Sequence, residues 1–238
     1  MKTKLIGTAV IAVFVAVGCG KNEGKKREAA MSIAGDMVAI PEKNFKMGKH
    51  EVTQAQWEAV MGNNPSAFKG ADLPVESVSW DDCQDFIKKL NALPEVKGSG
   101  WTYRLPTGKE WEYACRAGSK GDYCKLADGT EITKSTLGEV AWYNDNSGHK
   151  TQPVGQKKPN AFGLYDMHGN VCEWCDDLYA VGKSSRVFRG GSWFNLSWRC
   201  RAGHRRDSAS GDRNRNFGFR LAAFKDVNVF EERNNHEP

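Results

Sequence analysis

The sequence predicts an α+β domain with a few helices in its first half and short strands and turns in its second half. Three segments before residue 120 carry apolar residues at helical spacing, each preceded by Ser or Thr. After residue 120, short apolar runs alternate with clusters of Gly, Asn and Asp. Helices grouped ahead of a strand-rich region argue against a doubly wound parallel sheet.

Each of the three helices is expected to begin at a capping box, in which two residues three positions apart cap each other's backbone. The pairs are Thr53 with Gln56, Ser79 with Asp82, and Thr107 with Glu110. The predicted helices cover Gln54–Met61, Trp80–Leu93 and Trp111–Arg116, with glycines 62 and 118 as stops after the first and third. Strands are expected at Val38–Ile40 and Arg186–Phe188.

The N-terminus is typical of an exported protein. Lys2 and Lys4 precede an apolar run that is too short to span a bilayer and ends at Gly18-Cys19. A cysteine after a small residue resembles a bacterial lipobox, which implies that residues 1–18 are a signal peptide and that Cys19 is lipidated. The protein would then be anchored in the bacterial cell envelope, at the outer membrane or cell surface. The alternative is an ordinary signal peptide with an incidental cysteine.

Composition sets the remaining boundaries. Residues 19–36 are mostly charged or small, which predicts a flexible tether. Residues 37–225 are rich in Trp, Phe and Gly without a long linker, which fits one domain. Residues 226–238 form a polar tail. The net charge of +5 is spread along the chain, so composition gives little support for nucleic acid as a partner.

Six cysteines remain beyond Cys19, and an even number in an exported protein suggests disulfides of undetermined connectivity. The spacing of Cys172 and Cys175 also fits a thiol oxidoreductase, a second functional hypothesis. Metal binding by this pair would need further ligands, and His168 alone is weak support.

Several phrases occur in an order that resembles one family. They include Arg104-Leu105-Pro106-Thr107, Gly163-Leu164-Tyr165-Asp166-Met167, Gly169-Asn170-Val171, Arg189-Gly190-Gly191-Ser192-Trp193 and Gly218-Phe219-Arg220-Leu221. This pattern is similar to the sulfatase-modifying-factor, or formylglycine-generating-enzyme-like, family over about residues 37–225. The resemblance implies a loop-rich variant of the C-type lectin fold with few helices and short antiparallel strands.

The resemblance also bears on activity and on three kinds of site. Formylglycine synthesis needs two cysteines shortly after the Gly-Gly-Ser-aromatic phrase, and residues 194–199 contain none, so the chain is not expected to be an enzyme. The family pattern implies a disulfide between Cys115 and Cys200. It implies no cofactor except a calcium ion, held by the side chains of Asp166 and Glu173 and the carbonyls of Gly169 and Val171. The alternative is that these two acids cap turns and pair with arginine.

The segment 192–220 has an unusual composition. Lys, Glu, Gln and Met make up about a fifth of the chain, yet none occurs in this segment, which holds seven arginines. Random replacement of adenines in a pyrimidine-ending Asn codon reaches Phe, Leu, Ser, Arg, His, Asp, Ala, Gly and Asn, but not Lys, Glu, Gln, Met or Trp. The segment, with the lipobox, therefore resembles the variable region of lipoproteins diversified by a retroelement. The alternative is a lipoprotein of this fold with fixed specificity.

We expect the variable residues to form a ligand-binding surface on a rigid scaffold. Aromatic and arginine side chains favour a protein or glycan ligand, and the interspersed acids make nucleic acid unlikely. Trp198 cannot be reached from an Asn codon, so it is either fixed or drawn from another codon. The family resemblance assigns Arg201, Arg205, Arg213 and Arg220 to the scaffold. The predicted binding residues are Phe194, Asn195, Leu196, Trp198, Arg199, His204, Arg206, Asp207, Ala209, Asp212 and Arg215.

Overall fold

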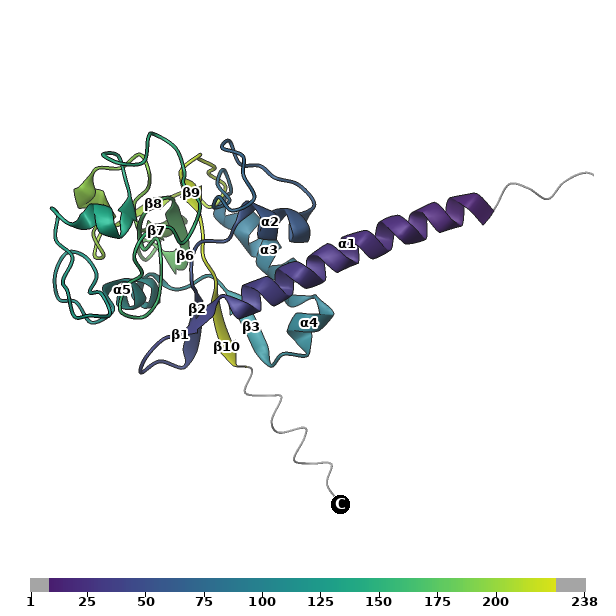
Figure 1. Ribbon diagram of the computed structural model, residues 1–238, viewed down its shortest axis with the longest axis horizontal. Coiled ribbons are helices and arrows are strands. Elements are labelled where there is room, and N and C mark those ends of the chain that lie inside the picture. The colour runs from purple at the N-terminus through teal and green to yellow at the C-terminus, as the bar shows by residue number, and fades with distance from the viewer. Residues whose placement is uncertain (1–8, 226–238) are drawn as a thin grey trace, which may run out of the picture.

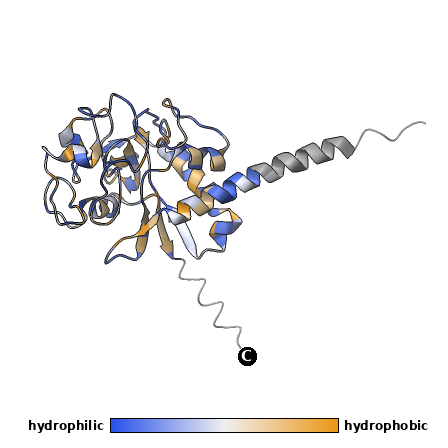
Figure 2. Ribbon diagram, viewed as in Figure 1, coloured by the Kyte–Doolittle hydropathy of each residue, from blue (hydrophilic) through white to orange (hydrophobic). Residues whose placement is uncertain are grey.

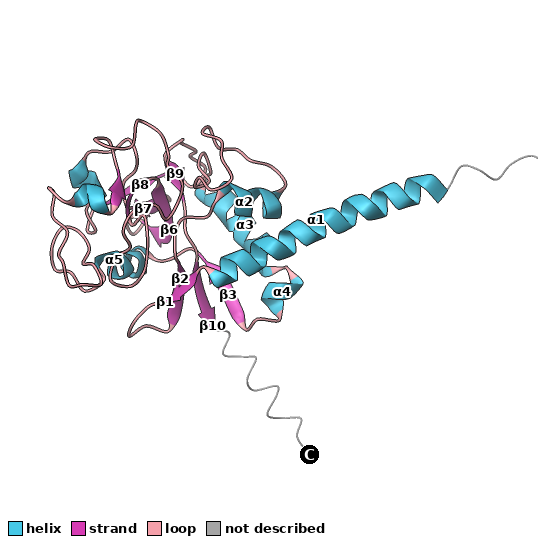
Figure 3. Ribbon diagram, viewed as in Figure 1, coloured by secondary structure: helices cyan, strands magenta, loops and turns pink. Residues whose placement is uncertain are grey.

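The computed structural model describes the backbone of residues 9–225 and the side chains from Asn22 onward. A long N-terminal helix extends from a body of helices, short strands and long loops (Figures 1 and 3). The helices are α1 (Ala9–Gly35), α2 (Gln54–Met61), α3 (Trp80–Asn91), α4 (Pro94–Lys97) and α5 (Gly108–Arg116), with 3₁₀ turns η1 (Leu137–Glu139) and η2 (Ser197–Cys200). This mixed architecture confirms the predicted fold class.

The three predicted helices form where the capping boxes place them. Both reciprocal hydrogen bonds are present at Thr53/Gln56, Ser79/Asp82 and Thr107/Glu110, so α2, α3 and α5 each start at the predicted cap. α5 begins three residues earlier than predicted, because Gly108–Glu110 already form its first turn. Gly62 ends α2 in the left-handed conformation with φ of 84°, which suits a residue without a Cβ.

α1 corrects the prediction of a flexible tether over residues 19–36. The C-terminal part of this helix packs against the domain through Ala29, Ala30 and Ile33, which are buried in the main core. Gln56 of α2 also donates a hydrogen bond to the hydroxyl of Ser32. The segment is rich in Ala, Lys, Glu and Arg, which favour helix, and lacks proline. Its low average hydrophobicity concealed a few apolar residues, which Figure 2 shows where α1 meets the body.

Three small sheets organise the body. The first has the order β1-β2-β10-β3 and is antiparallel, the second pairs β4 with β5, and the third has the order β8-β7-β6-β9, with β9 parallel to β6. The strands are β1 (Met37–Ala39), β2 (Phe45–Gly48), β3 (Trp101–Arg104), β4 (Ala141–Trp142), β5 (His168–Gly169), β6 (Cys172–Leu178), β7 (Arg186–Arg189), β8 (Arg205–Ser208), β9 (Phe217–Gly218) and β10 (Ala222–Lys225).

The core lies on both faces of β6. Trp174 packs on one face with Phe86, Leu90 and Phe219 in the larger core cluster, while Cys175 points into a second cluster. A third cluster lies under the loops before β4. No helix in the described part of the chain is long and apolar enough to cross a membrane.

Candidate ligand-binding site

A pocket of about 570 Å³ lies over one face of the β8-β7-β6-β9 sheet. Its floor consists of Cys172, Phe188 and Phe217, from three neighbouring strands. Side chains alternate between the faces of a strand, so Cys172 and Trp174 face this side while Glu173 and Cys175 face the other. The Phe188 and Phe217 rings lie 4.8 Å apart between centroids and form an apolar base.

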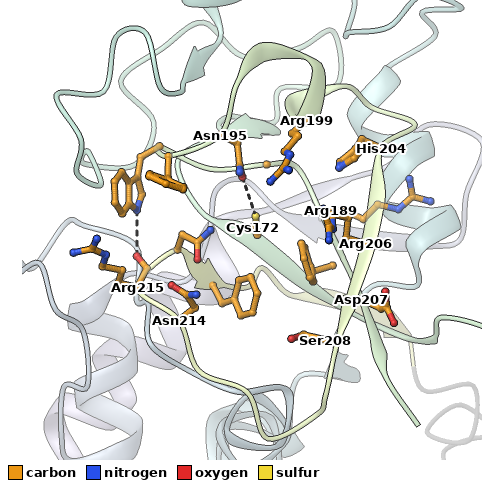
Figure 4. A pocket seen from close by; sticks show the side chains of 16 residues that line it. Cys172, Arg189, Asn195, Arg199, His204, Arg206, Asp207, Ser208, Asn214 and Arg215 are labelled. Carbon is orange, nitrogen blue, oxygen red and sulfur yellow. Dashed lines mark hydrogen bonds between the residues drawn. The ribbon is translucent and has the colours of Figure 1, made fainter. Parts of the chain in front are cut away.

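The rim is built from the segment whose composition is unusual. Arg199 projects from η2 toward the centre of the pocket, with Asn195 and His204 on either side of it (Figure 4). Arg206 comes from β8, and Arg215 precedes β9 on the opposite side. Residues separated by as many as 20 positions in the sequence therefore converge on one opening.

Most of the predicted binding residues are exposed or half-buried, as a surface that tolerates changes of side chain requires. Seven of the eleven line the pocket: Phe194, Asn195, Arg199, His204, Arg206, Asp207 and Arg215. Leu196 and Trp198 are exposed beside it, at 52% and 42%. Ala209 and Asp212 lie in a turn after β8, where the Asp212 carboxylate accepts hydrogen bonds from Ser208 and the Ala209 amide.

Asn195 is the most buried of the predicted binding residues. Only 8% of it is exposed, and its side-chain oxygen accepts a hydrogen bond from the Ser192 hydroxyl at 2.8 Å. Its backbone carbonyl accepts a hydrogen bond from the Asn144 amide. Asn195 therefore anchors the rim, and its residue type alone could not distinguish this role from that of an exposed neighbour.

Several pocket residues were not predicted. Phe188 and Arg189 precede the unusual segment, and Cys172 is more distant still, so no local signal pointed to them. Asn214 and Asn216 did carry a signal, because Asn codons are the proposed source of variation. The side-chain oxygen of Asn216 and Nε2 of His204 are buried without a hydrogen-bond partner, and both residues line the pocket. Unpartnered polar atoms of this kind favour a site that a polar ligand completes.

The pocket is positively charged. Burial lowers the pKa of His204, and the nearby Arg199 and Arg206 lower it further, so its imidazole is neutral at pH 7. The same two arginines act on the Cys172 thiol at the floor, although burial dominates there and raises its pKa to about 12. Asp207 is the one acid among the lining residues, and it accepts a hydrogen bond from Ser185.

The residues between floor and rim form a rigid support. Trp193 is 3% exposed, donates from its indole nitrogen to the Arg215 carbonyl, and packs edge-on against Phe68. Gly191 adopts φ of 72°, and a Cβ there would lie 2.7 Å from the Cys200 sulfur. Such contact leaves room only for glycine. The loop therefore keeps its path while neighbouring exposed side chains can differ.

The structure does not form the predicted Cys115–Cys200 disulfide. Both thiols are free and buried. The His168 ring lies beside both residues: Nδ1 is 2.7 Å from the Cys200 carbonyl, and Nε2 accepts from the Cys124 amide and lies 3.6 Å from the Cys115 sulfur. Because Nε2 accepts, Nδ1 carries the proton and donates it to the carbonyl. The neutral imidazole, rather than a covalent bond, therefore connects the segments around Cys115, Cys124 and Cys200.

The geometry also contradicts the oxidoreductase hypothesis. Cys172 and Cys175 lie three positions apart on β6, so their side chains point to opposite faces. Burial raises the pKa of both thiols, whereas a reactive dithiol needs a lowered pKa and exposure. The other four cysteines of the described domain are buried with raised pKa values too.

The residues expected to bind calcium fit an ion only in part. Glu173 is fully buried, and its carboxylate accepts hydrogen bonds from Arg220 and from the indole of Trp111. This leaves Glu173 poorly placed as a calcium ligand and matches the alternative of pairing with arginine. Asp166 does fit, because its Oδ1 is buried without a partner, while its Oδ2 accepts from the Gly155 amide. The backbone amides of Gly169 and Val171 donate hydrogen bonds to the Gly190 carbonyl and to the Glu51 carboxylate, respectively.

We predict that Asp166→Asn stabilises the protein at neutral pH by as much as about 3 kcal/mol. Burial raises the pKa of Asp166 to about 6, well above that of an unfolded Asp. Between about pH 4 and 6 the folded state therefore holds a proton that the unfolded state has released, so stability falls as pH rises through this window. Asparagine also accepts the left-handed backbone at this position, where φ is 56°.

Urea unfolding at pH 4, 5, 6 and 7 tests this prediction. Asp166→Asn should flatten the pH dependence relative to the wild type, with Glu51 as the source of the remaining slope because its pKa is raised in the same cluster. Equal slopes in both proteins would contradict the assignment. Repeating the pH 7 measurement with calcium tests the ion: a gain in stability in the wild type and not in Asp166→Asn would place calcium at Asp166.

The fold and site together define a domain of the formylglycine-generating-enzyme type. The sequence profile of the sulfatase-modifying factor enzyme 1-like domain matches residues 10–225, and the chain belongs to this family. It is 37% identical over 199 residues to the chaperone protein LppX of Paenibacillus barcinonensis, covering 63% of this chain and 69% of that protein.

Two further relatives bear on the site. The inactive Cα-formylglycine-generating enzyme 2 of Mus musculus is 32% identical over 72% of this chain, which spans 56% of that protein's length. Among solved structures, Treponema denticola variable protein 1 superposes with a TM-score of 0.67 at 31% identity, covering 78% of this chain and 90% of that one. The family resemblance and the likeness to a variable protein are therefore confirmed.

Proposed function

We propose that this chain is a surface-displayed lipoprotein that binds protein or glycan ligands in the pocket over the β8-β7-β6-β9 sheet, and that a retroelement diversifies the pocket rim. One observation carries the proposal: the compositionally biased segment forms most of the rim, over a floor and supports made of family residues. The similarity to Treponema denticola variable protein 1 supports it.

The proposal assigns no catalytic step to the pocket. Residues 194–199, where the family's chemistry needs thiols, hold none, and the nearby Cys172 and Cys200 are buried with raised pKa values. A binding role instead uses what the rim presents: arginine, aromatic and amide groups, which are the residue types that dominate binding interfaces.

Diversification predicts a specific distribution of changes. Sequencing the gene from many descendants of one cell should show substitutions at the codons of Phe194, Arg199, His204 and Arg206, each to a residue that an Asn codon can reach. Trp193 and Arg220 should stay constant, because both are buried scaffold. Flanking DNA should contain a reverse transcriptase gene and a near-copy of the segment. Their absence, or changes spread evenly over the domain, would leave a lipoprotein of fixed specificity.

Binding itself is tested with arrays of displayed proteins and glycans. A ligand captured by the full chain should be lost when Phe194, Arg199, His204 and Arg206 are all replaced by Ala. Arg205→Ala is the matched control, because Arg205 neighbours Arg206 in β8 but does not line the pocket and donates instead to the Tyr179 carbonyl. Capture that survives the quadruple replacement would place the binding site elsewhere.

Lipid anchoring at Cys19 is part of the same proposal and rests on the lipobox, since the Cys19 side chain lies outside the described ones. If residues 20–35 keep the helix of α1, they form a spacer of about 24 Å at about 1.5 Å per residue. Because α1 packs on α2, the spacer would hold the domain in a set orientation to the membrane. Cells fed a palmitate analogue should label the wild type and not Cys19→Ser; equal labelling would contradict the anchor.

A further inference from the structure

The arginines of the segment 192–220 fall into two groups. Four of them have polar partners: Arg201 with Asp122, Arg205 with the Tyr179 carbonyl, Arg213 with Asp82 and Arg220 with Glu173. The three that line the pocket, Arg199, Arg206 and Arg215, have no carboxylate within ion-pair distance among the described residues. Guanidinium groups favour planar, bidentate anions such as carboxylates.

An apolar crest stands next to these arginines. Phe194, Leu196 and Trp198 are exposed at 57%, 52% and 42%, while the intervening Asn195 and Ser197 are buried. This alternation projects three large apolar groups from one short segment. The described part of the domain has only three other large hydrophobic residues as exposed as these, and they lie outside the pocket. Exposed apolar groups clustered beside a charged pocket mark an interaction surface.

We infer that the ligand of this pocket is an acidic polypeptide segment, whose carboxylates meet Arg199, Arg206 and Arg215 while its apolar side chains pack on the crest of Phe194, Leu196 and Trp198. This inference rests on the proposed binding function and names the class of ligand. A polypeptide can place acidic and apolar side chains a few ångströms apart, as this rim requires. An acidic glycan would match the arginines but has little apolar surface for the aliphatic Leu196.

The pocket of about 570 Å³ has room for only part of a polypeptide segment. The aromatic base of Phe188 and Phe217 lies below the arginines, so one side chain of the ligand can enter the pocket while its neighbours stay on the crest.

The test is selection of phage-displayed 12-residue peptides on the immobilised full chain. Selected peptides should be enriched in Asp and Glu next to Leu, Phe or Ile. A synthetic peptide of the selected sequence should bind about tenfold or more weakly to Arg199→Gln/Arg206→Gln, since each guanidinium–carboxylate hydrogen bond is lost. Arg205→Gln should change the affinity by less than about twofold, because surface charges outside the contact contribute little. Higher salt should weaken binding to the wild type.

A crest variant, Phe194→Ser/Leu196→Ser, separates the two halves of the surface. This variant should bind the same peptide more weakly, but the binding should depend on salt as it does in the wild type, because the arginines are unchanged. Circular dichroism of each variant shows whether the fold is retained. Selected peptides without an acidic excess, or equal affinity for the double-arginine variant, would overturn the inference.

An array of uronic-acid and sulfated glycans distinguishes failure of the inference from failure of the proposed function. If such a glycan binds the wild type and not Arg199→Gln/Arg206→Gln, while no peptide is selected, the pocket binds ligands but the class named here is wrong. If neither peptides nor glycans bind in a way that depends on the rim, both proposals fail.

Discussion

Replacing Arg220 with Met is expected to destabilise the domain by about 3–5 kcal/mol, the usual cost of breaking a buried ion pair. Arg220 is fully buried, and its Nε and Nη2 each lie 2.7 Å from a carboxylate oxygen of Glu173. It also donates to the carbonyls of Gly48 and Tyr165, so it connects β2, β6 and the loop that precedes β5. Without it, Glu173 would share a buried site with Glu51 and Asp166 and would lack its paired cation.

Arg213→Met is the matched control for this experiment. Arg213 also forms a two-pronged pair, with Asp82 at 2.6 and 2.7 Å, but its side chain is 55% exposed. Solvent screens such a pair, so its loss should cost about 1 kcal/mol or less. Urea unfolding followed by far-UV circular dichroism gives both values. Similar midpoints for the two variants would show that burial of the Arg220 pair adds nothing.

A double replacement tests the cause. In Arg220→Met/Glu173→Met the uncompensated charge is gone, so the double variant should be more stable than Arg220→Met alone. Some loss should remain, because the Trp111 indole then lacks the acceptor that it has in Glu173. A double variant less stable than the single one would point to packing, and not charge, as the main contribution of Arg220.

Local signals in the sequence predicted local structure well. Each capping box uses residues three positions apart, so the starts of α2, α3 and α5 could be read from short segments. The N-terminal segment was misjudged because an average over residues 19–36 hid the few apolar residues that pack on α2. Its contact with α2 depends on tertiary packing, which composition does not show.

Features that depend on distant contacts were harder to predict. The paired cysteines were expected from a family pattern, but the placement of His168 beside Cys115 and Cys200 follows from the packing of α5, β5 and η2. The pocket rim could be predicted, because its residues share an unusual composition. The floor could not, because Cys172 and Phe188 are ordinary strand residues that reach the pocket only through sheet pairing.

Substitutions in the pocket rim and in the scaffold should also differ in how much they destabilise the domain. Trp193→Ala is expected to cost about 3–5 kcal/mol, as is usual for a buried aromatic residue. Trp193 is almost fully buried, packs on Phe68 and donates to the Arg215 carbonyl, so its loss would leave a cavity under the rim. The quadruple replacement of Phe194, Arg199, His204 and Arg206 by Ala removes more atoms but should cost no more than about 2 kcal/mol, at about 0.5 kcal/mol for each exposed site.

Thermal melts of the two variants beside the wild type make this comparison. The quadruple variant should melt well above Trp193→Ala and retain the wild-type circular dichroism spectrum, because Phe194 is 57% exposed and Arg206 is exposed too. The half-buried Arg199 and His204 set the upper end of the expected loss. If the quadruple variant melts as low as Trp193→Ala, the rim residues belong to the core. A rim that contributes so much to stability could not vary freely, and the pocket would then lose the property on which a diversified binding site depends.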